Sequence, residues 1–526
     1  MPVLLHRSTD LPTPHSYVWW MVVTAPEPDL DPERRFPGQA LALEEAFDHI
    51  RDDWWALGRL LAETPGGRIA HAPTCAPYNS DLGLMMAWGR LVGQIATRPE
   101  NVLILCDDPW VFRHLADLDG VSAGRPPKLW RREFIGGLRG MISRGRVAVR
   151  AALAALRTRS TRANHAIGDA VLVVYGHPAS STDGKDAYFG TLMRDIPALK
   201  RVLHTDCHSV RAMELSADNR TASLHAWGHP LFALTTIFSR WRPKAGYPYP
   251  WLVRRAAHLE GAGGSGTANA WQAHCHRRWL TAIRPRSVCW PWENHPWERS
   301  LVLQARLLQV ATVGYQHVVV GRHMYNQSSA PNPGGITELP DVLLCNGPGY
   351  LSQLRDWGVP SERLRIAGSL RISPVQRLSH DPTAPFFVAL SHDPAISSQM
   401  VDALTKLPKG IRFLVKAHPM FPFQLAESGT LRRTELPLPE QQKLAGVIFS
   451  TGTVGLESLL GGLPTFRFLP RGLVALHTLP PGVEAIDVDA DTLAGILDDP
   501  TLPPPISWDE VLSPPDLDTW LEALLI

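Results

Sequence analysis

The chain has 526 residues, of which 44% are hydrophobic and 19% are charged, and its formal net charge is +2. This composition excludes a disordered protein, and the length exceeds that of one ordinary domain, so we expect two to four domains. The sequence lacks the apolar run of roughly 18 residues that a membrane span needs, its first residues break too early for a secretory signal, and its cysteines form no C-x-x-C pair. These features argue against a zinc site and a disulfide framework and predict a cytoplasmic protein.

Residues 1–124 are predicted to form an N-terminal α/β domain. The spacing of apolar residues indicates helices over Gly38–Leu61 and Asp81–Ala96, and Asn101–Cys106 is typical of a buried strand. This strand leads directly into Asp107-Asp108. Acid pairs at the carboxyl end of a strand are often active-site groups, but the commoner role is to cap the next helix, which we expect for the second aspartate.

Residues 125–165 are predicted to be a basic amphipathic connector. The stretch 125–162 contains eleven Lys and Arg residues against one acid, Glu133, and apolar residues are interleaved with the cations. That composition suits a segment resting on an anionic membrane surface, and a solvated helix joining two domains is an equally weighted alternative. No nucleic-acid-binding motif accompanies the cations, so a nucleic-acid partner is not expected.

Residues 166–335 are predicted to form a first Rossmann-like domain. A continuous apolar strand, Ala170–Tyr175, is followed by a polar, glycine-containing loop and then by a predicted helix, Thr191–Leu199. Such a loop lies at the ligand edge of a parallel sheet. The titratable side chains in it are those of His177, Asp183 and Asp186.

A second strand, loop, helix and strand follow in the same domain. The strand Ser287–Trp290 precedes the helix Arg299–Leu308 and the strand Val310–Val313, which is the rhythm of a βαβ unit. We expect Glu298 only to favour the start of the helix. The polar residues that this rhythm brings to the ligand edge are Glu293, Gln316 and His317.

The polar segment Asn326–Glu338 reads as a linker, because it contains two prolines and two glycines in a short run. Residues 336–480 are then predicted to form a second Rossmann-like domain. Expected strands in it are Asp341–Cys345, Arg363–Ala367 and Pro385–Leu390, and the loops after the last two carry Gly368, Ser369, Arg371, Ser391 and His392. Residues 481–526 are predicted to be a tail with a closing helix from Asp516 to Leu525.

The clearest chemical pattern lies within the second Rossmann-like domain. The strand Phe413–Val415 delivers Lys416 and His418, and the strand Val447–Phe449 runs into the sequence S-T-G-T before a predicted helix. Hydroxyls and backbone amides at a helix start, facing a lysine and a histidine, predict a phosphate site. The residues of the S-T-G-T sequence are Ser450, Thr451, Gly452 and Thr453, and Glu457 follows in the helix.

Two Rossmann-like halves, with a phosphate site in the second, resemble the layout of GT-B glycosyltransferases. The pairing of K-A-H-P with S-T-G-T-V-G-L-E-S is similar to the "HP" and "Ser-Ser/Thr" motifs of bacterial sialyltransferases and of the Kdo transferases that build capsule and lipopolysaccharide. The resemblance implies an α/β, GT-B-like fold in which two Rossmann-like domains face a cleft, with the N-terminal α/β domain as an addition. It also implies a metal-independent enzyme without a cofactor, whose donor is a CMP-linked nonulosonic acid and whose acceptor is a glycan or lipid-linked glycan.

The resemblance assigns roles to the residues already named. His418, Lys416 and the S-T-G-T residues would hold the donor phosphate, and Glu457 would accept hydrogen bonds from the ribose. The acceptor half is 166–335, where the first candidate for the catalytic base is Asp186. Asp183 and Glu293 are the second and third candidates, and the cleft would be completed by His177, Gln316, His317, Gly368, Ser369, Arg371, Ser391 and His392.

Other functions fit the same pattern. A GT-B transferase could use a UDP-sugar, a GDP-sugar or a CDP-polyol, and an enzyme like UDP-GlcNAc 2-epimerase would share the fold. A protein of a different class, a non-catalytic scaffold of an envelope-polysaccharide complex, would use the basic connector as a tether to the inner face of the cytoplasmic membrane. The identity of the sugar, the acceptor and the stereochemistry stay open at the level of sequence.

Overall fold

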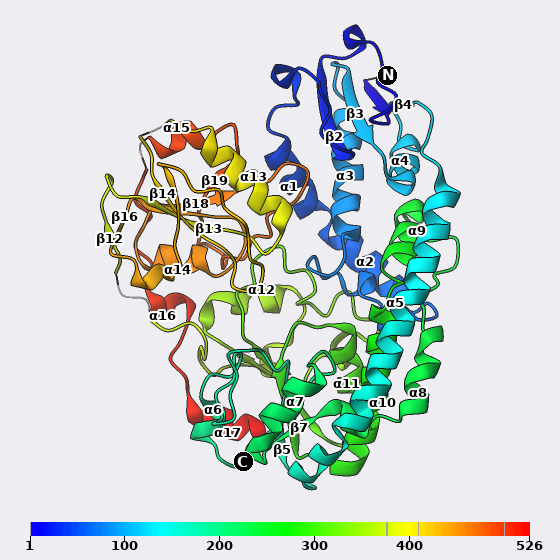
Figure 1. Ribbon diagram of the computed structural model, residues 1–526, viewed down its shortest axis with the longest axis vertical. Helices are drawn as coiled ribbons and strands as arrows, with labels where there is room; N and C mark the ends of the chain where they lie inside the picture. Colours follow the sequence, from blue (N-terminus) through cyan, green and yellow to red (C-terminus); the bar gives the residue numbers. More distant parts are fainter. Residues whose placement is uncertain (1, 375–376, 409, 499, 526) are drawn as a thin grey trace.

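The computed structural model describes residues 2–374, 377–408, 410–498 and 500–525 (Figure 1). The chain forms three α/β domains, each built on its own parallel sheet. In Figure 1 the N-terminal domain is blue, the middle domain runs from teal to green with the red end of the chain beside it, and the third domain is yellow to orange.

The N-terminal domain has a four-stranded sheet in the order β2-β3-β1-β4. Asp108 accepts hydrogen bonds from the backbone N–H groups of Trp110 and Val111 at the start of α4, so the predicted cap is confirmed. The helix expected over 38–61 is two helices that meet at Ile50. The elements are β1 (Val3–His6), β2 (Trp19–Thr24), β3 (Val102–Cys106), β4 (Val121–Ala123), α1 (Gln39–His49), α2 (Arg51–Ala62), α3 (Leu82–Ile95) and α4 (Pro109–Ala116).

A single 29-residue helix, α5 (Leu129–Arg157), occupies most of the predicted connector. Figure 1 shows it running from the N-terminal domain down the side of the middle domain, opposite the third domain. Its buried residues are small, and they include Gly140, Ala148 and Ala151, which lets neighbouring helices approach closely. Those neighbours are α8 (Pro230–Thr235), α9 (Pro250–Leu259) and α10 (Ser265–Ile283).

The middle domain is a Rossmann-like unit. Its seven parallel strands lie in the order β11-β10-β9-β8-β5-β6-β7, so the direction of winding reverses between β5 and β8. The helix expected over 191–199 is only the short α6 (Leu192–Asp195), because Pro197 disfavours helical geometry in the residue before it. The strands are β5 (Ala170–Val174), β6 (Lys200–Leu203), β7 (Thr221–Ser223), β8 (Ser287–Pro291), β9 (Ala311–Gln316), β10 (Val342–Cys345) and β11 (Leu364–Ile366).

The prediction that residues 326–338 form a linker between two domains is wrong. Strands β10 and β11 continue the middle sheet beyond it, so this sheet ends at Ile366 rather than near residue 335. The segment is held inside the middle domain because the buried amide of Asn294 donates to the carbonyls of Asn326 and Ser328, at 2.8 Å each. Its proline and glycine content therefore reflects an ordered irregular path, and not a flexible joint.

The third domain has a six-stranded parallel sheet in the order β15-β14-β13-β17-β18-β19. Counted from β13 along this sheet, the order is that of a doubly wound dinucleotide-binding fold, with its reversal between β13 and β17. Together with the middle domain it makes the expected α/β, GT-B-like architecture. The elements are β13 (Phe386–Ala389), β14 (Phe413–Lys416), β15 (Leu431–Arg433), β17 (Gly446–Phe449), β18 (Thr465–Phe468), β19 (Ile486–Val488), α13 (Pro394–Thr405) and α14 (Val454–Leu460).

The end of the chain returns from the third domain to the middle one. Helix α17 (Leu517–Leu524) buries Trp520 against Phe189 and Tyr315, and the indole N–H of Trp520 donates to the carbonyl of Ala367 at 3.0 Å. The closing helix predicted from Asp516 is therefore present, and it completes the middle domain.

A buried ion-pair network joins the third domain to the N-terminal domain. Arg467 on β18 is 1% exposed, donates to both carboxylate oxygens of Asp487 at 2.7 and 2.8 Å, and pairs with Glu44 on α1. From the middle domain, Arg322 approaches Glu44 at 3.6 Å and Asp48 at 3.3 Å. Burial raises the pKa of the Glu44 carboxyl, and the positive charge of Arg467 opposes that rise.

The same junction is tightened by a second contact. His323 pairs with Asp48 at 2.8 Å and accepts a hydrogen bond from the backbone N–H of His477 at 2.9 Å. Gly321 lies so close to this segment that a Cβ atom there would be 2.1 Å from the carbonyl oxygen of His477. All three domains therefore meet at one point, which fixes the walls of any site between them.

We expect the substitution Arg467→Met to lower the free energy of unfolding by about 3–5 kcal/mol, because it leaves the buried Glu44 carboxylate without its partner. The double variant with Glu44→Gln should regain part of that loss, because the buried carboxylate of Glu44 is then absent and only Asp487, which is one-third exposed, lacks its partner. Chemical and thermal denaturation of the two variants measures the difference. A single Arg467→Met variant as stable as wild type would show that the junction does not hold the domains.

Candidate functional site

The carboxyl ends of four strands define the candidate site. In the middle domain these are β5 and β8, between which the winding reverses, and in the third domain they are β13 and β17. Ligands of such sheets bind in the crevice at the reversal. The loops at these positions carry Tyr175, Glu293, His392 and the segment 450–453.

A carboxylate and two histidines lie at the middle-domain reversal. Glu293 follows β8, and its carboxylate is 2.7 Å from His295 Nε2 and 3.8 Å from His317 Nε2, which follows β9. Glu298, the third residue of helix α11 (Pro296–Leu307), holds the loop by accepting the backbone N–H groups of Glu293, Asn294 and His295. Its predicted role at the helix start is thus confirmed, and it also fixes the direction of Glu293.

The charges of this group differ from those of free side chains. Burial alone would raise the pKa of Glu293, but the hydrogen bond from His295 and the charges of His295, His317 and Arg371 outweigh it and lower the pKa to about 2. For His295 burial would lower the pKa, and the contact with Glu293 raises it instead. Burial lowers the pKa of His317 to about 4, so that imidazole is neutral near neutral pH. The cluster therefore offers an ionised carboxylate beside one readily protonated and one neutral imidazole.

Arg371 connects the middle-domain group with the third domain. It lies in the segment between the two sheets, its guanidinium is 5.4 Å from the centre of the Tyr188 ring, and Tyr188 in turn packs against His317 at 5.1 Å. Arg371 and Glu457 also line one cavity of about 360 Å³, whose other walls include Ile372. Burial raises the pKa of Glu457, while a hydrogen bond from Thr453 at 3.0 Å and the charge of Arg371 oppose it. The structure thus brings together two of the predicted donor-side residues, Arg371 and Glu457.

The third-domain loops bring two more predicted residues together. The rings of His392 and His418 are 6.3 Å apart, and both lie near Phe421. Lys416 donates to the carbonyl of Glu435 at 2.6 Å. Ser391, close to His392 in sequence, is buried, and its hydroxyl accepts the backbone N–H of Asp393.

In the S-T-G-T segment the first residue is buried in the domain and the other three are partly exposed. Ser450 is fully buried, and its hydroxyl donates to the carbonyl of Phe468, so it serves the sheet. Thr451, Gly452 and Thr453 are half-buried, and Gly452 adopts a φ of +130°, which favours glycine. The last three residues are the part of the motif that a ligand can reach.

The N-terminal domain supplies residues that the sequence did not reveal. Tyr78 packs against His392 at 5.3 Å, and the amide nitrogen of Asn79 lies 3.4 Å from His295 Nδ1. His71 is 5.9 Å from His295, ring centre to ring centre, and burial lowers its pKa to about 3. No periodicity or motif marks the segment 71–79, because its place in the site depends on the domain junction.

Asp186 does not have the environment of a catalytic base. Its carboxylate is buried, accepts the hydroxyl of Ser180 at 3.0 Å and the N–H of Tyr188 at 2.8 Å, and lies 3.8 Å from the fully buried Arg201. Asp183 is exposed and paired with Arg194 on the outside of the loop. Asp186 is therefore engaged by hydrogen bonds in the interior, and Asp183 is neutralised at the surface.

The remaining predicted residues have structural contacts. Gly368 adopts a φ of +84°, and a Cβ atom there would be 2.0 Å from the carbonyl oxygen of Pro514, while Ser369 donates its N–H to the carbonyl of Ser513. Gln316 is fully buried and donates to the carbonyl of Val318 at 2.5 Å. His177 is half-buried and accepts the N–H of Ala179. Gly368 and Ser369 therefore contact the C-terminal tail.

No family model matches the chain, and no curated protein matches it by sequence. Among solved structures, UDP-GlcNAc 2-epimerase from Methanocaldococcus jannaschii is 9% identical, with 68% of this chain and 99% of that chain covered and a TM-score of 0.37. UDP-N-acetylglucosamine 2-epimerase from Rickettsia bellii is 12% identical (64% and 89% covered, TM-score 0.34), and MurG from Acinetobacter baumannii is 11% identical (62% and 88% covered, TM-score 0.33). These TM-scores are too low for the likeness to bear on the function of this chain.

We expect Asp186→Ala to reduce the free energy of unfolding by about 3 kcal/mol, because it removes a buried partner of Arg201. Asp183→Ala is the matched control on the same loop, and its exposed carboxylate predicts a change within about 0.5 kcal/mol. Chemical denaturation compares the two variants. If Asp186→Ala were as stable as wild type and yet inactive, the aspartate would be a base after all.

Proposed function

We propose that the chain is a nucleotide-sugar enzyme of the GT-B type, and specifically a glycosyltransferase that acts on a cell-surface glycan or lipid-linked glycan. The observation that carries this proposal is the arrangement of polar groups at the two sheet reversals on either side of Arg371. This arginine stacks on Tyr188 of the middle domain, and its charge acts on Glu457 of the third domain. A ligand held at one reversal would present its reactive end to the other.

We assign the donor to the third domain. The half-buried residues Thr451, Gly452 and Thr453 offer hydroxyl and amide groups, and His418 offers an imidazole. Charge grows on the donor phosphate as the glycosidic bond breaks, so hydrogen-bond donors aimed there stabilise the transition state more than the ground state. The resemblance of K-A-H-P and S-T-G-T to the motifs of sialyl- and Kdo transferases supports a CMP-linked nonulosonic acid as the donor.

We assign the acceptor to the middle domain, with Glu293 and His295 in place of Asp186. The tautomer that fits both contacts of His295 carries its proton on Nε2, toward Glu293, and leaves the Nδ1 lone pair facing Asn79. An acceptor hydroxyl bound next to Nδ1 of His295 would transfer its proton to that nitrogen. The Glu293 carboxylate would stabilise the imidazolium that forms. His317, neutral near neutral pH, can orient the same hydroxyl.

An epimerase acting on a UDP-sugar is the second candidate. Its chemistry needs a base and an acid, and the site offers Glu293, whose pKa is lowered, and Glu457, whose pKa burial raises. An epimerase would convert or release its sugar without an acceptor, whereas a transferase would need one. Product analysis of a reaction that contains only the nucleotide-sugar separates the two activities.

A thermal-shift screen with CMP, CDP, UDP and GDP should give the largest stabilisation with CMP. A nucleotide at about 100 times its Kd stabilises the folded state by about 2.7 kcal/mol. His418→Ala should lose most of this effect, and His177→Ala, a histidine outside the third domain, should keep it. A larger effect of UDP or GDP would reassign the donor, and no effect of any nucleotide would favour a scaffold.

The rate of transfer should rise with pH through the pKa of His295. Because Glu293 raises that pKa above its ordinary value, the imidazole is protonated at low pH and becomes a base only as pH increases. In Glu293→Gln the raising charge is absent, so the rising limb of kcat/KM should move to lower pH, and kcat should fall about 100-fold. The thermal shift with nucleotide should be unchanged in this variant. If the rising limb of kcat/KM stayed at the same pH in Glu293→Gln, the pair of Glu293 and His295 would be excluded as the base.

A further inference from the structure

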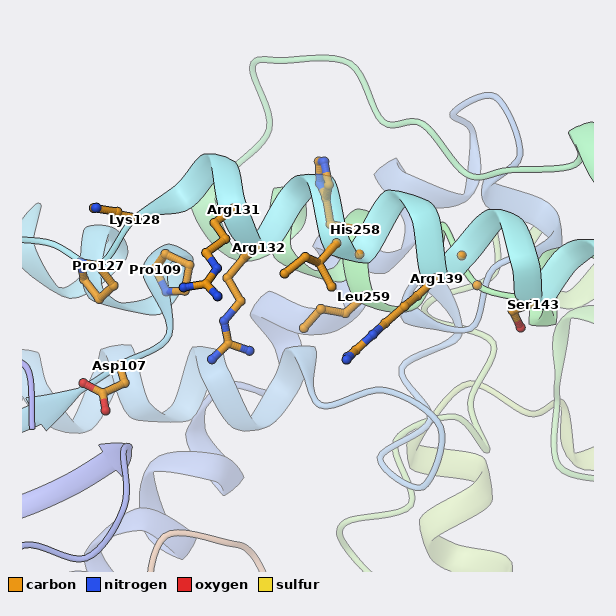
Figure 2. A pocket seen from close by; sticks show the side chains of 14 residues that line it. Asp107, Pro109, Pro127, Lys128, Arg131, Arg132, Arg139, Ser143, His258 and Leu259 are labelled. Atoms are coloured by element: carbon orange, nitrogen blue, oxygen red, sulfur yellow. The ribbon is translucent and has the colours of Figure 1, made fainter.

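An open groove of about 740 Å³ lies along the first half of α5 (Figure 2). Figure 1 shows this helix on the side of the molecule away from the third domain. Its walls are the first half of α5, the start of α4 and the end of α9. The groove has the size of a small-molecule site. The cationic side chains that line it are those of Lys128, Arg131, Arg132 and Arg139, with His258 on the opposite wall.

The cations are placed on one face by the helix itself. Arg131, Arg132 and Arg139 follow the spacing i, i+1 and i+8, which keeps them on one side of an α-helix, and Lys128 immediately precedes the helix. Figure 2 shows Arg131, Arg132 and Arg139 extending from the same side of α5. The helix packs closely on the loop after α9, because a Cβ atom at Gly140 would be 2.4 Å from the carbonyl oxygen of Ala262.

The positive charge of the groove is larger than its negative charge, because one aspartate lines it beside four Lys and Arg side chains. Asp107, the acid that lines it, accepts the backbone N–H and the hydroxyl of Ser8 at 3.0 and 2.5 Å. Glu133, the acid of this part of α5, pairs with Arg254 at 2.7 Å. Within the part of the chain that the structure describes, no carboxylate forms an ion pair with any of the four groove cations. The groove therefore attracts an anion.

Large apolar side chains are exposed beside the cations. Trp130, Phe134 and Met141 are 68%, 70% and 53% exposed, and with Leu138 they follow the spacing i, i+4, i+8 and i+11. An apolar stripe next to a basic stripe is the pattern of a helix that lies in the interface of an anionic bilayer. A soluble anion or a nucleic acid would use the cations and leave the aromatic and aliphatic side chains in water.

We propose that this groove binds the phosphate-bearing headgroup of an anionic membrane lipid, with the apolar stripe of α5 inserted among the acyl chains. The element that binds the lipid is then the first half of the basic connector, around residues 128–143. Arg146, Arg150 and Arg157, further along the same helix, lie outside the groove. The site does not rest on the proposed function, since it uses none of the residues assigned to donor or acceptor.

Two variants of equal charge test this site in the full-length chain. The first variant removes three cations from the groove by the substitutions Arg131→Gln, Arg132→Gln and Arg139→Gln. The second variant removes three cations from elsewhere on α5 by the substitutions Arg146→Gln, Arg150→Gln and Arg157→Gln. Sedimentation with phosphatidylglycerol-containing vesicles should show a loss of affinity of roughly 100-fold for the first variant. The second variant should stay within a few-fold of wild type. Equal losses in both would overturn the site, since they indicate diffuse attraction.

Two further measurements separate the lipid from other anions. Wild type should not sediment with vesicles of phosphatidylcholine alone, and Phe134→Ser with Met141→Ser should weaken binding to the anionic vesicles. Binding of the anionic vesicles that survives unchanged in this apolar variant would overturn the proposal. The proposal would also be overturned if a duplex oligonucleotide displaced the vesicles and bound the apolar variant with the same affinity as wild type. Circular dichroism and melting temperature should be unchanged in all variants, because these side chains are exposed.

Discussion

The site depends on the buried ion pair between Arg467 and Glu44. Two charges removed from water are costly unless each finds its partner, so Arg467 must take both Asp487 and Glu44 at once. The contact with Glu44 ties the third domain to helix α1. Arg322 and His323 add the middle domain to the same point. Tyr78 and His392, which belong to different domains, consequently meet at 5.3 Å.

In the middle domain, the buried carboxylate of Glu298 fixes the loop that carries Glu293. Glu298 accepts three successive N–H groups of the loop after β8, and the indole of Trp290 donates to it at 2.8 Å. With its backbone fixed in this way, the loop directs Glu293 toward His295 and His317. Burial raises the pKa of Glu298 to about 7, although the charge of His295 and the hydrogen bonds from His295 and Trp290 oppose the rise. Glu293 and His295, the pair that we propose as reactive, are thus placed by the carboxylate of Glu298.

Local patterns predicted most strands and their order along the chain, because runs such as Ala170–Tyr175 have to be buried wherever they fold. The polar segment 326–338 misled for the converse reason, since its prolines and glycines serve a buried path fixed by Asn294. Asp186 and Glu293 both lie in polar loops that follow a buried strand. Arg201 neutralises the first, while the second meets two histidines, and such pairings between distant segments cannot be predicted from spacing alone.

The N-terminal domain contributes to both the candidate site and the proposed lipid-binding groove. It contributes Tyr78 and Asn79 to the site and the start of α4 to the basic groove, whose other walls include the first half of α5 in the connector. Figure 1 places α5 and the third domain on opposite sides of the molecule. A protein held to lipid through α5 would therefore keep its third domain toward the aqueous phase, where a nucleotide-sugar can enter. The ion-pair junction that fixes the three domains would then also fix the orientation of the site relative to the membrane.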